Sequence, residues 1–131
     1  MKDKMIYEDD PELARQLEVE EEVERKPKQP VATPISPDIK MIRSTNAGVF
    51  YGRVIKMKGD TVTLRGARRL WYWDGAATLS ELATYGTSKP DKCKFPVATR
   101  GDHIVLGVCE IIPMTWTAIA SLDAVPIWTE R

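Results

Sequence analysis

After residue 39, apolar and polar positions follow the two-residue period of β-strands. The segment VFYGRVIKM (49–57) is apolar on both faces, and so is HIVLGVCEII (103–112). A strand of this kind is either central between two layers or covered by a partner. A Gly-Asp pair at 59–60 separates the first segment from a second β-prone run, TVTLRGARRLWYW (61–73). This arrangement predicts a hairpin.

Two short segments have the signals of helix ends instead. In TLSELATYG (78–86), Thr78 and Glu81 form a capping box, and Gly86 stands where a helix should stop. A second helix is predicted over TWTAIASL (115–122), with a threonine at its cap. The pattern therefore predicts a strand-rich α+β domain, built as a small antiparallel sheet or partly open barrel with two short helices.

The N-terminal residues differ in character. Residues 1–26 predict an acidic helical arm, with Asp10 as a cap and Pro11 at the first helical position. Glutamates interrupt its apolar stripe, so we expect the arm to need a partner. The candidate partner-binding residues of the arm are Leu13, Leu17, Val19 and Val23.

A linker separates this arm from the folded body. The segment PKQPVATPISPD (27–38) contains four prolines, a composition typical of an extended linker. The sequence therefore predicts three parts: the arm (1–26), the linker (27–38) and a globular strand-rich domain (39–131).

Composition narrows the class of protein. The 131 residues are 43% apolar and 29% charged, which fits one globular domain. Formal net charge is zero, but residues 1–30 carry a net −4 and residues 43–131 a net +4. The basic excess is too small to indicate nucleic-acid binding. No apolar run approaches the roughly 20 residues of a membrane span, and no signal-peptide core is visible, so we expect a cytosolic protein without a membrane partner.

Candidate chemistry is sparse. His103 is the only histidine, and the sequence places no nucleophile beside it, so we expect a surface or partly hydrogen-bonded side chain. A metal site would have to combine His103 with Cys93 and Cys109, without the close ligand pairs of a structural zinc. Two free, packed thiols are the favoured alternative. With no phosphate-binding glycine motif either, the sequence predicts no catalytic residue, metal or cofactor.

The aromatic block ARRLWYWDGAA (67–77) is the strongest candidate for a contact site. In an extended strand, Trp71 and Trp73 point to one side with Arg69, while the intervening leucine and tyrosine point to the other side with Arg68. Tryptophan with arginine is typical of interface anchors and of stacking on flat ligands. The alternative is a core edge in which arginine stems cover indole rings. The candidate interface or ligand contacts are Arg68, Arg69, Trp71, Tyr72, Trp73 and Asp74.

The segments NAGVFYG, ARRLWYWDGAATLSELA, CKFP and AVPIW resemble an uncharacterised family of small tailed-bacteriophage proteins. The resemblance covers roughly residues 41–128, and many relatives start near the first strand. It implies a phage origin, and it implies that the arm and linker are an addition in this chain. It carries over no functional residues.

Two functional hypotheses follow. The first is a non-enzymatic minor or decorating component of a phage particle, which contacts other phage proteins or copies of itself. The second is a host-takeover protein that sequesters a nucleotide signal on the arginines and tryptophans of the block. A nucleic-acid-binding accessory factor is a weaker variant. The implied location is the host cytoplasm during infection and, for a particle component, the virion.

Five basic residues are candidates for a rim that attracts the phosphate of a nucleotide. The alternative is that they form a solvated charged face. The five are Lys56, Lys58, Arg65, Arg68 and Arg69.

Overall fold

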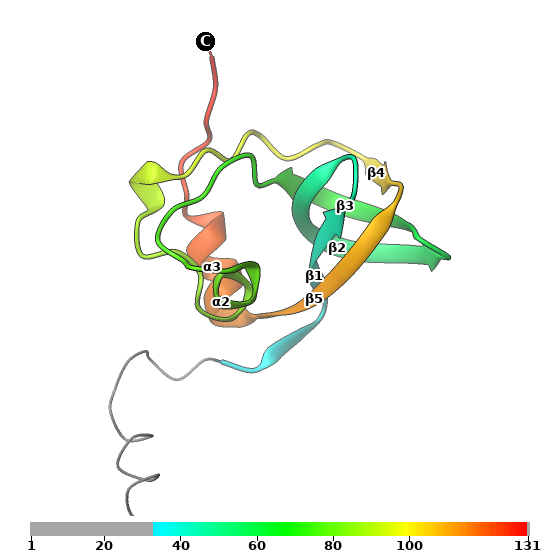
Figure 1. The fold of residues 1–131 in the computed structure, drawn as a ribbon, viewed down its shortest axis with the longest axis horizontal. Helices are drawn as coiled ribbons and strands as arrows, with labels where there is room; N and C mark the ends of the chain where they lie inside the picture. Colours follow the sequence, from blue (N-terminus) through cyan, green and yellow to red (C-terminus); the bar gives the residue numbers. More distant parts are fainter. Residues whose placement is uncertain (1–32, 131) are drawn as a thin grey trace, which may run out of the picture. The chain divides into compact units, whose positions relative to one another are not determined.

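The computed structural model describes residues 33–130. They form an antiparallel sheet of five strands in the order β4-β3-β2-β1-β5, shown in Figure 1. The sheet is not closed into a barrel, and the predicted strand-rich α+β class is confirmed. The strands are β1 (Ile35–Ser44), β2 (Gly48–Lys58), β3 (Thr61–Arg69), β4 (Asp102–Val105) and β5 (Val108–Thr115).

Both predicted helices are present, and they lie together at one side of the sheet (Figure 1). Helix α2 (Leu79–Tyr85) begins at Thr78, whose side chain accepts the Glu81 backbone N–H, and it ends at Gly86. Helix α3 (Trp116–Asp123) is capped in the same way by Thr115. A 3₁₀ turn (Pro90–Lys92) lies in the loop that follows α2. Within the described residues, neither α-helix has the length and apolar character needed to traverse a bilayer.

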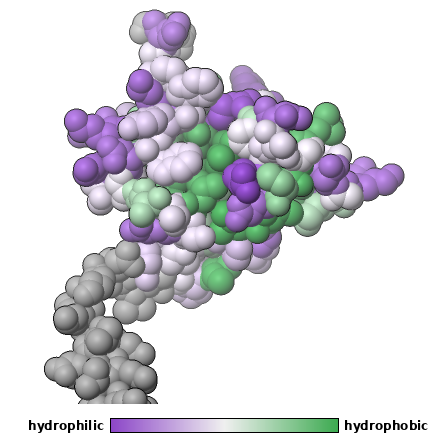
Figure 2. All heavy atoms as spheres, in the orientation of Figure 1, coloured by the Kyte–Doolittle hydropathy of each residue, from purple (hydrophilic) through white to green (hydrophobic). Residues whose placement is uncertain are grey.

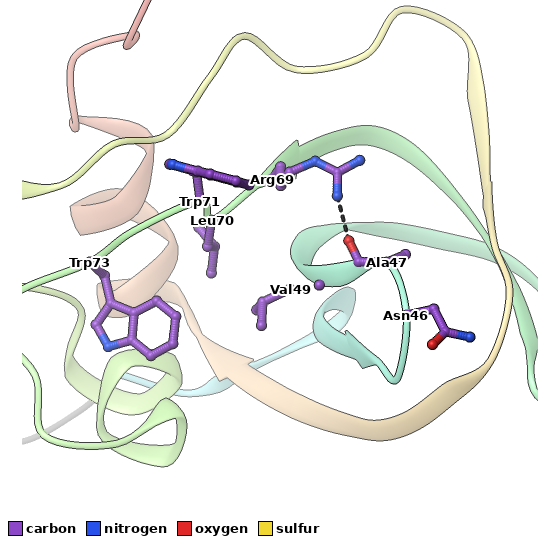
Figure 3. A pocket seen from close by; sticks show the side chains of 8 residues that line it. Asn46, Ala47, Val49, Arg69, Leu70, Trp71 and Trp73 are labelled. Carbon is purple, nitrogen blue, oxygen red and sulfur yellow. Dashed lines mark hydrogen bonds between the residues drawn. The ribbon is translucent and has the colours of Figure 1, made fainter.

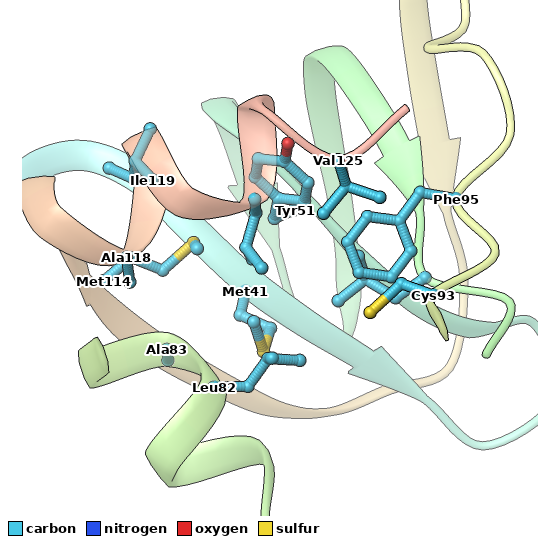
Figure 4. Packing of buried hydrophobic residues seen from close by; sticks show 12 residues of the cluster. Met41, Tyr51, Leu82, Ala83, Cys93, Phe95, Met114, Ala118, Ile119 and Val125 are labelled. Atoms are coloured by element: carbon cyan, nitrogen blue, oxygen red, sulfur yellow. The ribbon is translucent and has the colours of Figure 1, made fainter. Parts of the chain in front are cut away.

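Two hydrophobic clusters occupy the two faces of the sheet. Neighbouring residues on the central strands divide between them: Met41 and Tyr51 join the cluster beneath the helices, whereas Ile42 and Phe50 join the other. Figure 4 shows the first cluster, where α2 and α3 pack over β1 and β2. The central strands are therefore apolar on both faces because protein covers both faces.

The second cluster indicates how strongly the sheet curls. It contains Val105 from β4 at one edge of the sheet, and Val108 and Ile111 from β5 at the other edge pack against it. Residues from opposite edges can share one cluster only if the sheet bends back on itself. The sheet is thus a strongly curled layer whose edges are not joined by a ladder.

Several boundaries differ from the sequence-based expectation. Strand β1 starts at Ile35, inside the segment expected to be a linker, and Ser36 is fully buried with its hydroxyl accepting the Ile39 N–H at 3.1 Å. The run 103–112 is two strands, because Gly107 turns the chain at φ 68°. The predicted arm, with Leu13, Leu17, Val19 and Val23, lies outside the described residues.

Candidate functional site

The aromatic block changes its partners at the end of β3. Leu70 still donates its N–H to the Val49 carbonyl of β2, but Tyr72 exchanges backbone hydrogen bonds with Lys94 in a loop. The side-chain alternation expected of one long strand fails at this point. Trp71 is 63% exposed and Tyr72 is also exposed, while Leu70 is buried. Trp73 is partly buried and packs against the core beneath the helices. The block therefore contributes to both the interior and the surface.

Arg68 lies in the interior, with only 7% of its surface exposed. Its guanidinium donates to four backbone carbonyls: Pro96 at 3.1 Å, Phe95 at 3.2 Å, Leu122 at 2.9 Å and Val125 at 2.8 Å. It also lies 5.4 Å from the centre of the Phe95 ring. Arg68 thus fastens the loop before β4 to the end of α3. Its position does not support the expectation that it contacts a ligand or a partner.

A buried tyrosine extends this interior network. The Tyr51 hydroxyl donates to Asp123 Oδ1 at 2.7 Å. Burial raises the pKa of Tyr51 far above its ordinary value, and the hydrogen bond to Asp123 adds to the shift, while Arg68 opposes it. The hydroxyl therefore stays protonated and keeps its role as a donor. We refer to Tyr51, Phe95, Arg68 and Asp123 as the interior network.

A second group of aromatic residues is exposed. The rings of Trp71 and Trp128 are parallel to within 5°, with centroids 6.5 Å apart, and Trp128 is 36% exposed. The Lys94 ammonium lies 5.6 Å from the Trp128 ring and 6.0 Å from the Tyr72 ring. The backbone N–H of Trp128 donates to the Phe95 carbonyl at 3.0 Å, which fixes the C-terminal segment beside the block. We define the aromatic surface as Trp71, Tyr72, Lys94, Ile127 and Trp128.

A pocket of about 330 Å³ lies between the β1–β2 turn and the end of β3 (Figure 3), and Trp71 of the aromatic surface also lines it. Trp71 and Trp73 stand at one end, and Arg69 extends from the end of β3 to the turn and forms one wall. The Arg69 guanidinium donates to the Ala47 carbonyl and lies 4.3 Å from the centre of the Phe50 ring. The lining residues are Asn46, Ala47, Gly48, Val49, Arg69, Leu70, Trp71 and Trp73.

The remaining candidates of the block and of the basic rim lie elsewhere. Asp74 accepts the Gly75 N–H at 2.7 Å and so supports a turn. Arg65 pairs with Asp102 at 3.0 Å across the β3–β4 edge. Lys58 lies at the far end of the β2–β3 hairpin from the Phe50–Arg69 pair. The structure therefore does not gather the five rim residues at the pocket, and only Arg69 lines it.

His103 is partly buried between the second cluster and the pocket wall. Its Nδ1 lies 2.9 Å from Thr99 Oγ1, and its ring packs edge-on against Phe50 at 5.0 Å. Burial, followed by the positive charge of Arg69, lowers the pKa of His103 below its ordinary value. The hydroxyl neighbour was not visible in the sequence, since Thr99 belongs to a loop without a motif.

The two cysteines are free and do not meet His103 in a metal site. Cys93 is buried, as expected, but Cys109 is exposed on β5, which corrects the expectation that both thiols are packed. Residues 33–130 hold no group of three or more His, Cys, Asp or Glu side chains placed to bind a metal ion.

Sequence reasoning missed three of the five residues of the aromatic surface. Lys94, Ile127 and Trp128 were not among the candidates, because they lie in segments without a periodic pattern. Trp128 reaches Trp71 only because the segment after α3 returns along Phe95. No local signal in the sequence records this tertiary arrangement.

A family model described as a domain of unknown function (DUF6948) matches residues 39–122. The chain belongs to this family. The matched range includes the aromatic block, most of the sheet, all of α2 and nearly all of α3. It ends before Ile127 and Trp128. The family description assigns no activity and no functional residues. No curated protein and no solved structure matches the chain.

Proposed function

We propose that this protein is a non-enzymatic contact protein, and that it binds its partner through the aromatic surface. The observation that carries the proposal is the exposed parallel pair of Trp71 and Trp128, beside exposed Tyr72 and Ile127. Aromatic side chains that remain exposed in one group are typical of interface anchors. Lys94 adds a cation at the same place, which favours a partner with acidic or carbonyl groups.

The surroundings of this surface support contact with a macromolecule. The backbone of Tyr72 is paired with Lys94, and that of Trp128 is bonded to Phe95, so the rings stand on fixed backbone. Ordering of these groups therefore costs little entropy when a partner binds. Figure 2 shows that strongly apolar residues gather at the centre of one face, with hydrophilic residues around them; tryptophan and tyrosine are pale on this scale, so the green area does not mark the aromatic surface.

The resemblance to small tailed-phage proteins supplies the biological setting of the proposal. We infer a minor or decorating component of the phage particle, whose partners are other phage proteins or further copies of this chain. Its location is then the host cytoplasm during infection and, after assembly, the virion. Nucleic acid is not the proposed partner, because the aromatic surface contains a single cation.

The experiment compares purified phage particles that carry different versions of the chain. We expect mass spectrometry to find the wild-type protein in particles at a constant copy number, and to find the double variant W71S/W128S lost from them. Trp116, at the start of α3, is 44% exposed and outside the aromatic surface, so Trp116→Ser is the matched control and should be retained. Absence of the wild-type protein from particles, or equal incorporation of the double variant, would overturn the proposal.

A further inference from the structure

We propose that the pocket beside Arg69 binds a nucleoside monophosphate, with the base against the indole rings and the phosphate on the guanidinium. The inference does not depend on the contact function proposed above, although Trp71 lines the pocket and also belongs to the aromatic surface. It rests on the size of the pocket, on the chemistry of its walls and on the way in which Arg69 is held.

The size and walls fit a small planar ligand. A volume of about 330 Å³ lies at the lower end of the range for ligand sites, which suits one nucleotide better than two. Val49 and Leu70 provide apolar surface between the turn and the indoles of Trp71 and Trp73 (Figure 3). Base stacking on such rings is favourable and tolerates any base. Asn46 lies in the turn at the end of the pocket away from the indoles, and its amide points away from them (Figure 3).

Arg69 is prepared for an anion. Its guanidinium is held over the Phe50 ring at 4.3 Å and hydrogen-bonded to the Ala47 carbonyl, so its orientation is fixed before a ligand arrives. Among the described residues 33–130, the Ala47 carbonyl is the one hydrogen-bond acceptor of Arg69. An arginine has five N–H donors, so four of them are left for a ligand. Arg68, by contrast, uses four donors inside the fold.

The local charge favours the same ligand. None of the residues that line the pocket is acidic, so Arg69 has no competing carboxylate there. The planar fork of a guanidinium matches a phosphate group through paired hydrogen bonds. The cation at one wall and the indoles at the other end are the two features that a nucleotide would use together.

The first test titrates the full chain with AMP, GMP, CMP and UMP, followed by calorimetry and tryptophan fluorescence. At least one nucleotide should saturate the protein at one ligand per chain. The corresponding nucleoside should bind at least about tenfold more weakly, because it lacks the charge-assisted hydrogen bonds. Failure of all four nucleotides to saturate by about 1 mM, or equal binding of nucleoside and nucleotide, would overturn the proposal.

Variants then locate the site. Arg69→Gln should weaken nucleotide binding about tenfold or more, whereas the control Arg65→Gln, an exposed arginine on the same strand, should leave it unchanged. Because Arg69 also contacts Phe50, its variant is first checked by thermal unfolding, and Trp71→Leu serves as a second variant at an exposed position. Nucleotide affinity that neither Arg69→Gln nor Trp71→Leu reduces would refute the assignment.

A last variant separates this inference from the contact function. Trp128 belongs to the aromatic surface but does not line the pocket. Trp128→Ser should therefore keep wild-type nucleotide affinity. If Trp128→Ser abolished nucleotide binding while Arg69→Gln retained it, the ligand would lie on the aromatic surface and the pocket assignment would fail. Neither result depends on whether the protein enters phage particles.

Discussion

The interior network and the aromatic surface are built from the same kinds of residue. Each contains a cation near an aromatic ring, at 5.4 Å for Arg68 with Phe95 and at 5.6 Å for Lys94 with Trp128. Each also contains a tyrosine. The interior tyrosine donates to Asp123, while the other tyrosine is exposed beside Lys94. What separates the two regions is therefore the set of groups around each residue, not its type.

Backbone carbonyls account for the difference. In the interior, the chain turns so that four carbonyl oxygens point at one guanidinium, which satisfies its donors after water has been removed. At the aromatic surface water remains available to the lysine, and the rings keep much of their area exposed. The interior residues should thus determine stability, and the exposed residues should determine binding. The following predictions test this division in order of decreasing effect.

The largest difference is expected for aromatic rings. Phe95 is fully buried, and Phe95→Ala should lower the free energy of unfolding by about 3–5 kcal/mol, since it creates a cavity in the core. Trp71→Ala removes a larger side chain but should cost at most about 1 kcal/mol, because most of that ring is exposed. Denaturant unfolding of both variants measures the two values. Similar losses in the two variants would contradict the division.

The arginines give the next largest difference. Arg68→Met should cost about 3 kcal/mol, because it removes four hydrogen bonds of a buried guanidinium. Among the described residues, the Pro96 and Val125 carbonyls then lose their donor, while the Phe95 and Leu122 carbonyls keep a backbone N–H. Arg65→Met is the control, and it should change stability by no more than about 0.5 kcal/mol, since the Arg65–Asp102 pair is exposed. Chemical denaturation compares them under one condition. An Arg68→Met variant as stable as the control would show that Arg68 does not fasten the fold.

The fold was largely predictable from local patterns. The two helices were found from their capping residues, and the two apolar faces of 49–57 indicated the central position of β2. The same pattern in 103–112 did not mark a central strand, because this run forms β4 and β5, the two edge strands of the sheet. Errors arose where a single residue changes the chain direction, as at Gly107, or where prolines enter a strand, as Pro37 does in β1. Proline is tolerated there because Pro37 lies between Ile35 and Lys40, where the pairing of β1 with β5 shifts its register, and the pairing with β2 begins only at Ile39.

The site was predictable only in part. The sequence identified the aromatic block, but it could not distinguish the buried Arg68 from the partly buried Arg69 that lines the pocket, because β-strand alternation ends at Arg69. Arg68 is defined by carbonyls that come from residues 95–96 and 122–125. Trp128 is likewise brought to Trp71 by tertiary structure. These partners are distant in the chain, so no spacing rule could reveal them.

The tyrosines give a smaller difference. Tyr51→Phe removes the hydrogen bond to Asp123 and should cost about 1 kcal/mol, without creating a cavity. Tyr72→Phe changes an exposed ring in the same chemical way, and it should be neutral within about 0.5 kcal/mol. Thermal and denaturant unfolding of both variants provide the comparison. A loss at Tyr72 equal to that at Tyr51 would indicate that the aromatic surface also contributes to stability.

The smallest effect concerns His103, which lies between the second core and the pocket wall. Its pKa is lowered, so the unfolded chain takes up a proton as the pH falls through about 6.5, while the folded chain does so only at lower pH. The unfolded state binds more protons in that window, and stability should therefore decrease as the pH falls below about 6.5 and level off above it.

His103 is the only histidine, so this decrease should be largely absent in His103→Gln. Arg69→Gln should reduce it as well, because the Arg69 charge causes part of the shift. Stability that is flat as the pH falls from 7.5 to 5.5 would mean that the fold does not lower the pKa of His103, and stability that rises would mean that the fold raises it; either result would contradict the effect of burial and of the Arg69 charge.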